Sequence, residues 1–170
     1  MRVVELDAEA EPYWEELVAG EQHPWGAAGE GLSWRDKTRN IGLRDDDGRL
    51  LAAGGAVLAE LHTAAGPPFA VVGLGGMVVT RSARGHGLAR ELAGHLLQLA
   101  RGLPADRAML FCEPHLVGLY REFGFQEIPD PVWVDQPGGR LRMPMGAMWR
   151  PLREGVGWPP GELYLDGEPF

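Results

Sequence analysis

The spacing of apolar and polar residues divides the chain into helix-like and strand-like segments. Apolar residues recur at helical spacing over residues 88–103, and Pro104 ends the pattern, so a long helix is expected there. A shorter helix is expected over residues 116–123, because Gly124 stops it. The apolar runs typical of strands lie at residues 40–43, 49–61, 69–80 and 107–112.

Turn residues between these segments indicate how they connect. The Asp-Gly pair at residues 47–48 separates the first two runs and predicts a hairpin. Residues 132–134 and 141–149 flank Gln-Pro-Gly-Gly and predict another hairpin. Residues 9–19 carry apolar positions among carboxylates and predict an amphipathic helix. The order of elements predicts an α/β fold, a mixed central β-sheet of about six to seven strands flanked by helices.

Length and composition favour one domain. A chain of 170 residues with 45% hydrophobic content is long enough for a single buried core and too short for two ordinary domains. We expect residues 1–150 to form that domain. Residues 151–170 are rich in glycine and proline but also contain Trp158, Leu163 and Phe170, so this tail either packs on the body or is partly loose.

Charge and composition limit the partners. A net charge of −8 argues against nucleic acid, because phosphate backbones are bound through clustered positive charge. No apolar run is long enough to cross a bilayer, and residues 1–7 do not resemble a leader, so we expect a cytoplasmic protein without membrane contact. The single cysteine excludes an internal disulfide, and the scattered histidines predict no metal site. A homodimer and a monomer both remain open.

Residues 73–89 carry the most informative chemistry. An apolar strand-like run leads into a turn of small residues that opens the long helix. The start of a helix has backbone N–H groups without partners and a partial positive charge, so it can hold an anionic pyrophosphate. Gly85 and Gly87 let the chain approach the phosphates, and Arg84 adds positive charge. Neither the Rossmann fingerprint nor the Walker pattern is present, and Lys37, the only lysine, lies far upstream.

This segment resembles the GNAT superfamily of acyl-CoA-dependent N-acyltransferases. The acyl-CoA loop of that family, Gln/Arg-x-x-Gly-x-Gly/Ala, is matched by Arg84, Gly87 and Ala89, with Val79 at the strand end before it. A second family block, Leu-Tyr-x-x-x-Gly-Phe, is matched by Leu119, Tyr120, Gly124 and Phe125. The specific part of the resemblance covers residues 70–127.

The resemblance implies acetyl-CoA as acyl-donor co-substrate. Its implied binding residues are Met77, Val78, Val79, Arg84, Gly85, His86, Gly87, Leu88, Ala89 and Arg90. A backbone N–H near Val78 or Val79 is expected to bind the oxyanion where neighbouring strands splay apart. The resemblance assigns to Tyr120 the role of donating a proton to the departing CoA thiolate. Because a phenol of pKa ~10 is a weaker acid than a thiol of pKa ~8.5, Tyr120 is expected mainly to donate a hydrogen bond.

The base that deprotonates the acceptor amine is less well defined. Relatives often place a carboxylate on the strand before the loop, but residues 69–80 contain none. Glu113 and His115 are candidates, although each also suits a helix start near Pro114. Cys112 follows a buried apolar run and is expected to be a core residue. His23, Trp25 and Trp34 lie in the irregular segment where relatives build their acceptor pocket, and they either shape specificity or cover the core.

These observations predict an N-acetyltransferase that moves acetyl from acetyl-CoA to a primary amine of a small molecule, by direct attack in a ternary complex. Tyr120 and Glu113 are the candidate catalytic residues. An alternative keeps the fold without the chemistry, as a catalytically weak acyl-CoA-binding or partner-binding GNAT-like protein. A nucleotide-binding module that uses the loop for ATP or NAD is a third interpretation. The sequence leaves the acceptor and the acyl length open.

Overall fold

The computed structural model describes residues 1–7, 13–18, 20–22, 24 and 26–170. The strands in this part of the chain are β1 (Arg2–Leu6), β2 (Arg39–Arg44), β3 (Leu50–Thr63), β4 (Phe69–Val79), β5 (Arg107–Cys112), β6 (Gln126–Glu127), β7 (Val132–Val134), β8 (Leu141–Arg142), β9 (Gly146–Pro151) and β10 (Leu163–Leu165). The helices are α1 (Tyr13–Val18), α2 (Leu88–Arg101) and α3 (Val117–Glu122), with short 3-10 turns η1 (Arg81–Ala83) and η2 (Pro114–Leu116).

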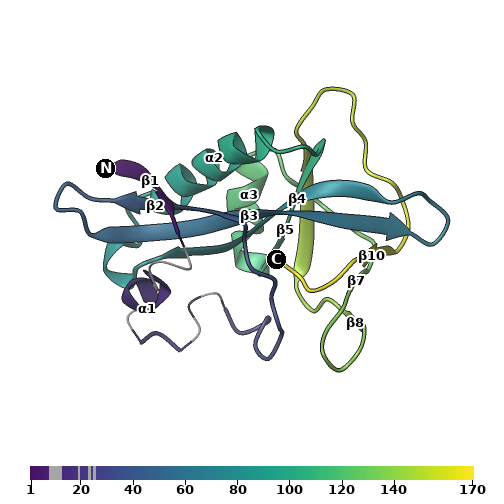
Figure 1. The fold of residues 1–170 in the computed structure, drawn as a ribbon, viewed down its shortest axis with the longest axis horizontal. Helices are drawn as coiled ribbons and strands as arrows, with labels where there is room; N and C mark the ends of the chain where they lie inside the picture. The colour runs from purple at the N-terminus through teal and green to yellow at the C-terminus, as the bar shows by residue number, and fades with distance from the viewer. Residues whose placement is uncertain (8–12, 19, 23, 25) are drawn as a thin grey trace.

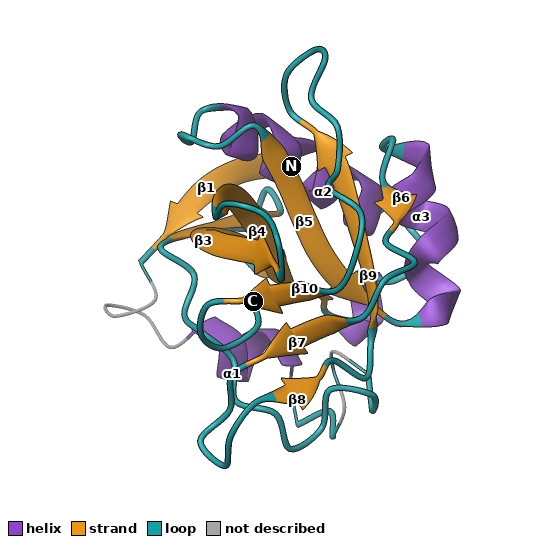
Figure 2. Ribbon diagram, turned by 90° about the vertical axis from the view of Figure 1, so that its right-hand side faces the viewer, coloured by secondary structure: helices purple, strands orange, loops and turns teal. Residues whose placement is uncertain are grey.

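The strands form one mixed, curled sheet. Its order is β6-β9-β5-β4-β3-β10-β7-β8. Strand β2 pairs with residues 50–56 of β3, and β1 pairs with the other edge of β2. The pairs β4–β5 and β10–β7 are parallel, and the other pairs are antiparallel. The strong bend of the sheet from β5 through β10 to β7 is visible in Figure 2. Helices α2 and α3 lie on one side of the long strands and α1 lies on the other (Figure 1).

The predicted α/β class is confirmed, but the sheet has more strands than expected. The described residues form ten strands, and the additional ones are short. Strands β6 and β8 contain two residues each, and β10 contains three. Segments of this length show no periodicity from which a strand can be predicted. Strands β6 and β10 pair with strands that are distant in sequence, whereas β8 pairs with the nearby β7.

One predicted hairpin is wrong in its second half. Strand β7 does pair with Leu141–Arg142, but residues 146–151 form β9, which pairs with β5 and β6. Pro144 lies between the two pieces and has no N–H with which to continue a ladder. The predicted helix over residues 9–19 is described only as α1, and residues 8–12 and 19 lie outside the described part of the chain.

The sheet separates two large apolar clusters. On one face, α2 buries Leu88, Leu92, Ala93, Leu96, Leu97 and Ala100, mostly within a cluster that also contains strand residues such as Val72 and Leu110. The other cluster contains Met109 and Phe111 of β5 together with Leu163, Leu165 and Phe170 near the chain end. Phe170 is only 2% exposed. The last residues are therefore part of the packing around the central strands.

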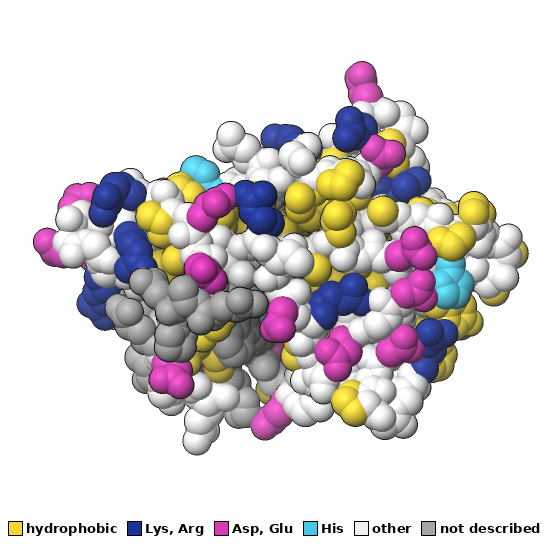
Figure 3. Space-filling view, viewed as in Figure 1, with side chains coloured by type: hydrophobic (Ala, Val, Ile, Leu, Met, Phe, Trp, Pro, Cys, Tyr) yellow, Lys and Arg dark blue, Asp and Glu magenta, His cyan; other side chains and the backbone are white. Residues whose placement is uncertain are grey.

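The surface carries charges of both signs. Figure 3 shows acidic and basic side chains interspersed over one face, without a large patch of either sign. Within the described residues, no helix combines the length and apolar character needed to span a membrane.

Candidate active site

A cleft of about 1310 Å³ runs along the end of β4. One end is formed by the loop before α2, including Arg84, Gly85 and Gly87. Tyr120 and Glu113 line it from the β5 side. Its walls also include Trp14, Trp34, Lys37, Met145 and Phe170, which come from other segments of the chain. The cleft therefore joins the predicted donor loop to the segment expected to bind the acceptor.

The cleft opens where two parallel strands separate. Strands β4 and β5 pair through Leu74–Leu110 and no further, although β4 continues to Val79. On the side that faces β3, β4 contains a bulge. Two residues of β4, Gly76 and Met77, lie opposite a single residue of β3. Gly76 adopts φ +62°, a conformation that other residues enter with strain. The bulge and the separation leave the edge of β4 at Val78 and Val79 facing the opening.

The loop before α2 presents free backbone donors. Gly85 and Gly87 both have φ +81°, and Gly87 caps the start of the helix. Among the described residues, no hydrogen bond uses the backbone N–H groups of residues 85–89. A Cβ at either glycine would meet nothing within 4 Å, so the space beside the loop is open. These features suit an anionic ligand at the start of a 14-residue helix.

The side chains around this loop are less free than its backbone. Arg84 donates two hydrogen bonds to Glu21, at 2.8 and 2.6 Å, and one to the carbonyl of Val79 at 3.0 Å. These bonds from Arg84 lower the pKa of Glu21. Arg90 is paired in the same way with Glu122, at 2.7 and 2.8 Å. Both candidate arginines thus already hold a carboxylate.

The remaining loop residues contribute mainly through the backbone. The Nδ1 atom of His86 lies 2.9 Å from the carbonyl oxygen of Arg84, so this nitrogen carries the proton when the bond forms. The side chain of Leu88 is 6% exposed and belongs to the core. Only its backbone can therefore meet a ligand.

Tyr120 is held by the way α3 ends. The helix stops at Gly124, which has φ +77°, and the N–H of Phe125 bonds back to the carbonyl of Tyr120 at 3.2 Å. The ring of Phe125 meets the Tyr120 ring edge-on at 6.0 Å. The phenol donates to the sulfur of Met77 on β4 at 3.4 Å, and burial raises the pKa of Tyr120 well above its usual value. The hydroxyl is therefore a neutral donor aimed at β4.

Glu113 lies directly after β5 and lines the cleft. Its carboxylate already accepts a hydrogen bond from the chain. Its Oε1 accepts the N–H of Ala28 at 3.0 Å, and its Oε2 lies 3.5 Å from Nδ1 of His115. Gly26 has φ +91°, and a Cβ there would lie 2.1 Å from Oε1, so a larger residue would be strained and would displace this carboxylate. Glu113 thereby fastens the loop at residues 26–28 to the end of β5.

Several cleft residues were not predicted. Glu21, Lys37 and Phe170 all contribute to the lining, and each comes from a segment without a regular pattern. The only feature of Lys37 in the sequence that could have drawn attention to it is that it is the single lysine. His23 and Trp25 lie outside the described residues, whereas Trp34 lines the cleft.

Two further observations limit the chemistry of the site. Cys112 also lines the cleft, and burial raises the pKa of its thiol to about 11, which makes it a poor nucleophile. Within the described part of the chain, no group of three or more His, Cys, Asp or Glu side chains is arranged to hold a metal ion.

Solved structures with a similar fold include N-acetyltransferases, two of them in complex with CoA or acetyl-CoA. The GNAT family N-acetyltransferase YhbS from Escherichia coli, in complex with CoA, has a TM-score of 0.59 and 17% identity, covering 98% of this chain and 91% of that chain. The ribosomal-protein-S18-alanine N-acetyltransferase from Escherichia coli has a TM-score of 0.58 and 17% identity, covering 92% and 99%. A phosphinothricin acetyltransferase from Sinorhizobium meliloti, in complex with AcCoA, has a TM-score of 0.52 and 19% identity, covering 90% and 73%.

At these identities the likeness concerns the fold. No curated protein matches the sequence significantly. The sequence model of the Acetyltransferase (GNAT) family, however, matches residues 3–125, which include β4, the loop, α2 and Tyr120. The expected resemblance is confirmed, and the chain belongs to the GNAT family of acetyltransferases.

Proposed function

We propose that this protein transfers an acetyl group from acetyl-CoA to the primary amine of a small molecule, by direct attack while both substrates are bound. One observation carries the proposal. A single cleft contains the unpaired N–H groups at the start of α2 and the gap between β4 and β5, with the Tyr120 hydroxyl directed at β4. An anion-binding element and a place for a reacting carbonyl are thus adjacent.

The donor is held mainly by backbone. The N–H groups of residues 85–89 bind the pyrophosphate, with Arg84 and Arg90 beside them. The edge of β4 at Met77, Val78 and Val79 pairs with the amides of the pantetheine arm, as an added strand would. That edge is available because β5 leaves β4 after Leu74.

The protein then stabilises the charge that forms during transfer. A backbone N–H at Val78 or Val79 donates to the oxygen of the acyl carbon as it becomes negative. Tyr120 releases its hydrogen bond to Met77 and donates to the departing sulfur instead. Because its pKa is raised, Tyr120 keeps its proton and acts as a hydrogen-bond donor, and solvent completes protonation of the thiol.

The acceptor amine must lose a proton before it attacks, since an alkylamine has a pKa of ~10.4. Glu113 is the carboxylate best placed in the cleft to accept it, directly or through water, and His115 lies beside it. We infer a small acceptor because the loop tied down by Glu113 contributes Gly26 and Gly29 to the wall of the cleft. The cytoplasm supplies acetyl-CoA and is the compartment we infer.

The first test is thermal stability with acetyl-CoA, with ATP and NAD as controls. Ligand at ~100 times its dissociation constant adds about 2.7 kcal/mol. For a protein of this size, 1 kcal/mol moves the melting temperature by about 2–4 °C, so a rise of about 5–10 °C is expected with acetyl-CoA alone. An equal rise with ATP or NAD, or none with acetyl-CoA, would refute donor binding at this loop.

The second test is thiol release from acetyl-CoA with a panel of primary amines. Tyr120→Phe is expected to lower kcat by about 10–100-fold, because a hydrogen bond to a charged group contributes about 1.5–3 kcal/mol. The thermal shift with acetyl-CoA should remain. Tyr164→Phe is the matched control, because that hydroxyl bonds to Glu162 at 3.2 Å and does not line the cleft.

A second function is a protein that binds acyl-CoA without turning it over. Two features favour it, the lack of a carboxylate on β4 and the engagement of Glu113 with Ala28. It predicts the same thermal shift with acetyl-CoA, but no amine-dependent thiol release. Stoichiometric release with any amine would exclude it.

A further inference from the structure

The wall of the cleft that includes Trp34 also contains two cations that the proposed chemistry does not use, Arg35 and Lys37. The aliphatic stem of Lys37 lies across two paired glycines, Gly55 of β3 and Gly75 of β4. Its Cβ lies 2.6 Å from where a Cβ on Gly55 would be, and its Cε lies 3.0 Å from the same point on Gly75. A Cβ on Gly55 would collide with the stem and with Oδ1 of Asn40. A Cβ on Gly75 would collide first with the main-chain carbonyl group of Phe170, at 2.5 and 2.8 Å, and then with the stem. The two glycines therefore leave room for the stem, and Gly75 also leaves room for the main chain of Phe170.

The stem carries its ammonium group to the point where β4 leaves β5. Gly75 follows Leu74, the last β4 residue that pairs with β5, and precedes Val78 by three residues. Lys37 and Val78 line the same cleft. The cation thus lies on the acceptor side of the strand at which the acyl carbon is proposed to react.

The known partner of this ammonium is a neutral group. Nζ donates to the carbonyl oxygen of Arg35 at 3.0 Å, and the described residues provide it with no ion pair. An ammonium group has three donors, so further hydrogen bonds are available to a ligand. Burying a cation without a carboxylate partner costs free energy, and an anionic ligand that pairs with it would offset this cost.

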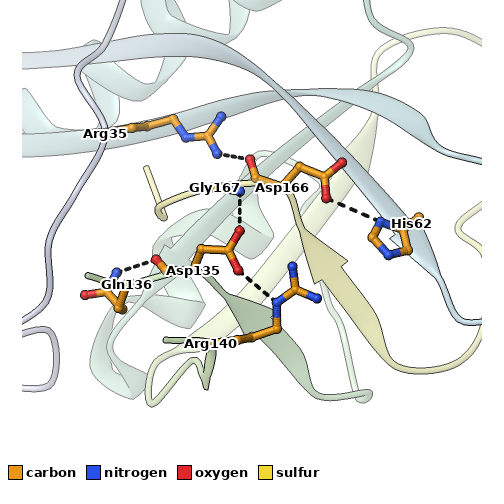
Figure 4. A network of polar contacts seen from close by, with 7 residues as sticks. All are labelled: Arg35, His62, Asp135, Gln136, Arg140, Asp166 and Gly167. Atoms are coloured by element: carbon orange, nitrogen blue, oxygen red, sulfur yellow. Dashed lines mark hydrogen bonds and ion pairs between the residues drawn. The ribbon is translucent and has the colours of Figure 1, made fainter. Parts of the chain in front are cut away.

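The neighbouring cation, Arg35, is used differently. Its Nε donates to the carbonyl of Glu168 at 2.6 Å, its terminal nitrogen donates to the carbonyl of Asp166, and its backbone N–H donates to Pro169 at 2.8 Å. Figure 4 shows Arg35 directed at Asp166, and Asp135 bridging Gly167 and Arg140. Arg35 therefore fixes the tail as a wall of the cleft, and Lys37 remains the cation available to a ligand.

The protonation of Lys37 suits an anion. Burial lowers its pKa to about 8, with Arg35 adding to the effect and Asp36 opposing it. At pH 7 most molecules therefore still carry the charge. A general base would need the opposite protonation state.

We propose that Lys37 binds a carboxylate of the acceptor, so that the acceptors are amino acids rather than simple amines. This inference rests on the proposed acetyl transfer and specifies its substrate class. The carboxylate would meet the ammonium near Gly75, next to the main-chain carbonyl group of Phe170, while the amine reaches the acyl carbon near Val78.

The test compares matched acceptors that differ only in the carboxylate. Amino acids and the corresponding decarboxylated amines, such as phenylalanine and phenethylamine, are assayed by thiol release from acetyl-CoA. The wild-type protein should prefer the acids. Lys37→Met keeps a stem of similar length and should lower kcat/KM for the acids by about 10–100-fold, mainly through KM, and leave the amines unchanged.

A control variant separates the loss of this particular cation from the loss of positive charge in general. Arg39→Met removes an exposed cation that pairs with Glu5, and it should change neither class of acceptor. Equal loss for acids and amines in Lys37→Met would indicate a structural role and overturn the proposal. Faster acetylation of an N-terminal peptide amide than of free amino acids would overturn it in favour of a protein acceptor. Thiol release with no amine at all would refute the proposed function itself.

Binding of the acceptor to Lys37 can also be measured directly, in the wild-type protein and without turnover. Because Lys37 is the only lysine, reductive methylation with ¹³C-formaldehyde gives one lysine signal by NMR. With CoA in place of acetyl-CoA, adding an amino acid should shift this signal, and adding the decarboxylated amine should not. No shift with any acid, in a protein that releases thiol with amines, would refute the carboxylate assignment and leave the acetyltransferase proposal intact.

Discussion

The contact between the chain end and the central strand can be tested by replacing both partners. Phe170 is 2% exposed, and its ring centroid lies 5.1 Å from that of Phe111. A Cβ built on Gly73 of β4 would lie 2.4 Å from the ring of Phe170. The glycine therefore provides the space that the aromatic ring fills.

Each single substitution has an expected magnitude. Phe170→Ala removes a buried ring and should lower the free energy of unfolding by about 3–5 kcal/mol. For a chain of this size that corresponds to a fall of about 6–20 °C in melting temperature. Gly73→Ala forces a methyl group into the ring and should cost about 1–3 kcal/mol by overpacking.

The double variant distinguishes this contact from general damage. With the ring removed, the methyl group at position 73 has room, so the two losses should add to less than their sum. Urea denaturation followed by circular dichroism measures all three free energies. Leu58→Ala is the control, because Leu58 lies on β3 and is 40% exposed, and it should change stability by less than about 0.5 kcal/mol. Strict additivity would refute the assigned contact.

Two further predictions concern side chains at the cleft. Glu21→Gln should tighten acetyl-CoA binding measured by calorimetry, because Glu21 then no longer competes with the pyrophosphate for Arg84; weaker binding would show that Glu21 supports the donor site. Cys112 should react with iodoacetamide at pH 8 about 100-fold more slowly in the folded than in the urea-unfolded protein, because its pKa is raised to about 11 and little thiolate is present. Raising the pH towards 11 should restore the reaction, and equal rates at pH 8 would contradict the burial.

The parts of the fold predicted from sequence are those specified by neighbouring residues. The start of α2 follows from glycines at 85 and 87 and from helical spacing after them, and the structure begins the helix at Leu88. Tyr120 was found because Gly124 and Phe125, which position it, are four and five residues away. Such signals are local, so one sequence is sufficient to read them.

The parts that could not be predicted depend on contacts between distant segments. Arg84 and Glu21 are 63 residues apart, and Glu113 and Ala28 are 85 apart. Phe170 packs against Gly73 from a tail with no repeating apolar pattern. Chain separation of this kind leaves no periodic trace. Apart from Trp34, whose segment the resemblance had assigned to the acceptor pocket, the contacts of this part of the cleft therefore emerged only from the folded structure.

The pairing of the arginines decides how the donor is recognised. Arg84 and Arg90 each hold a carboxylate, so these two side chains bring little net positive charge to the loop. The protein as a whole carries −8, which disfavours an anionic ligand at long range. The attraction for a pyrophosphate therefore has to come from the N–H groups of residues 85–89 and the dipole of α2. These backbone groups have fixed positions, so they recognise the geometry of the pyrophosphate, and the arginines contribute only after Glu21 and Glu122 release them.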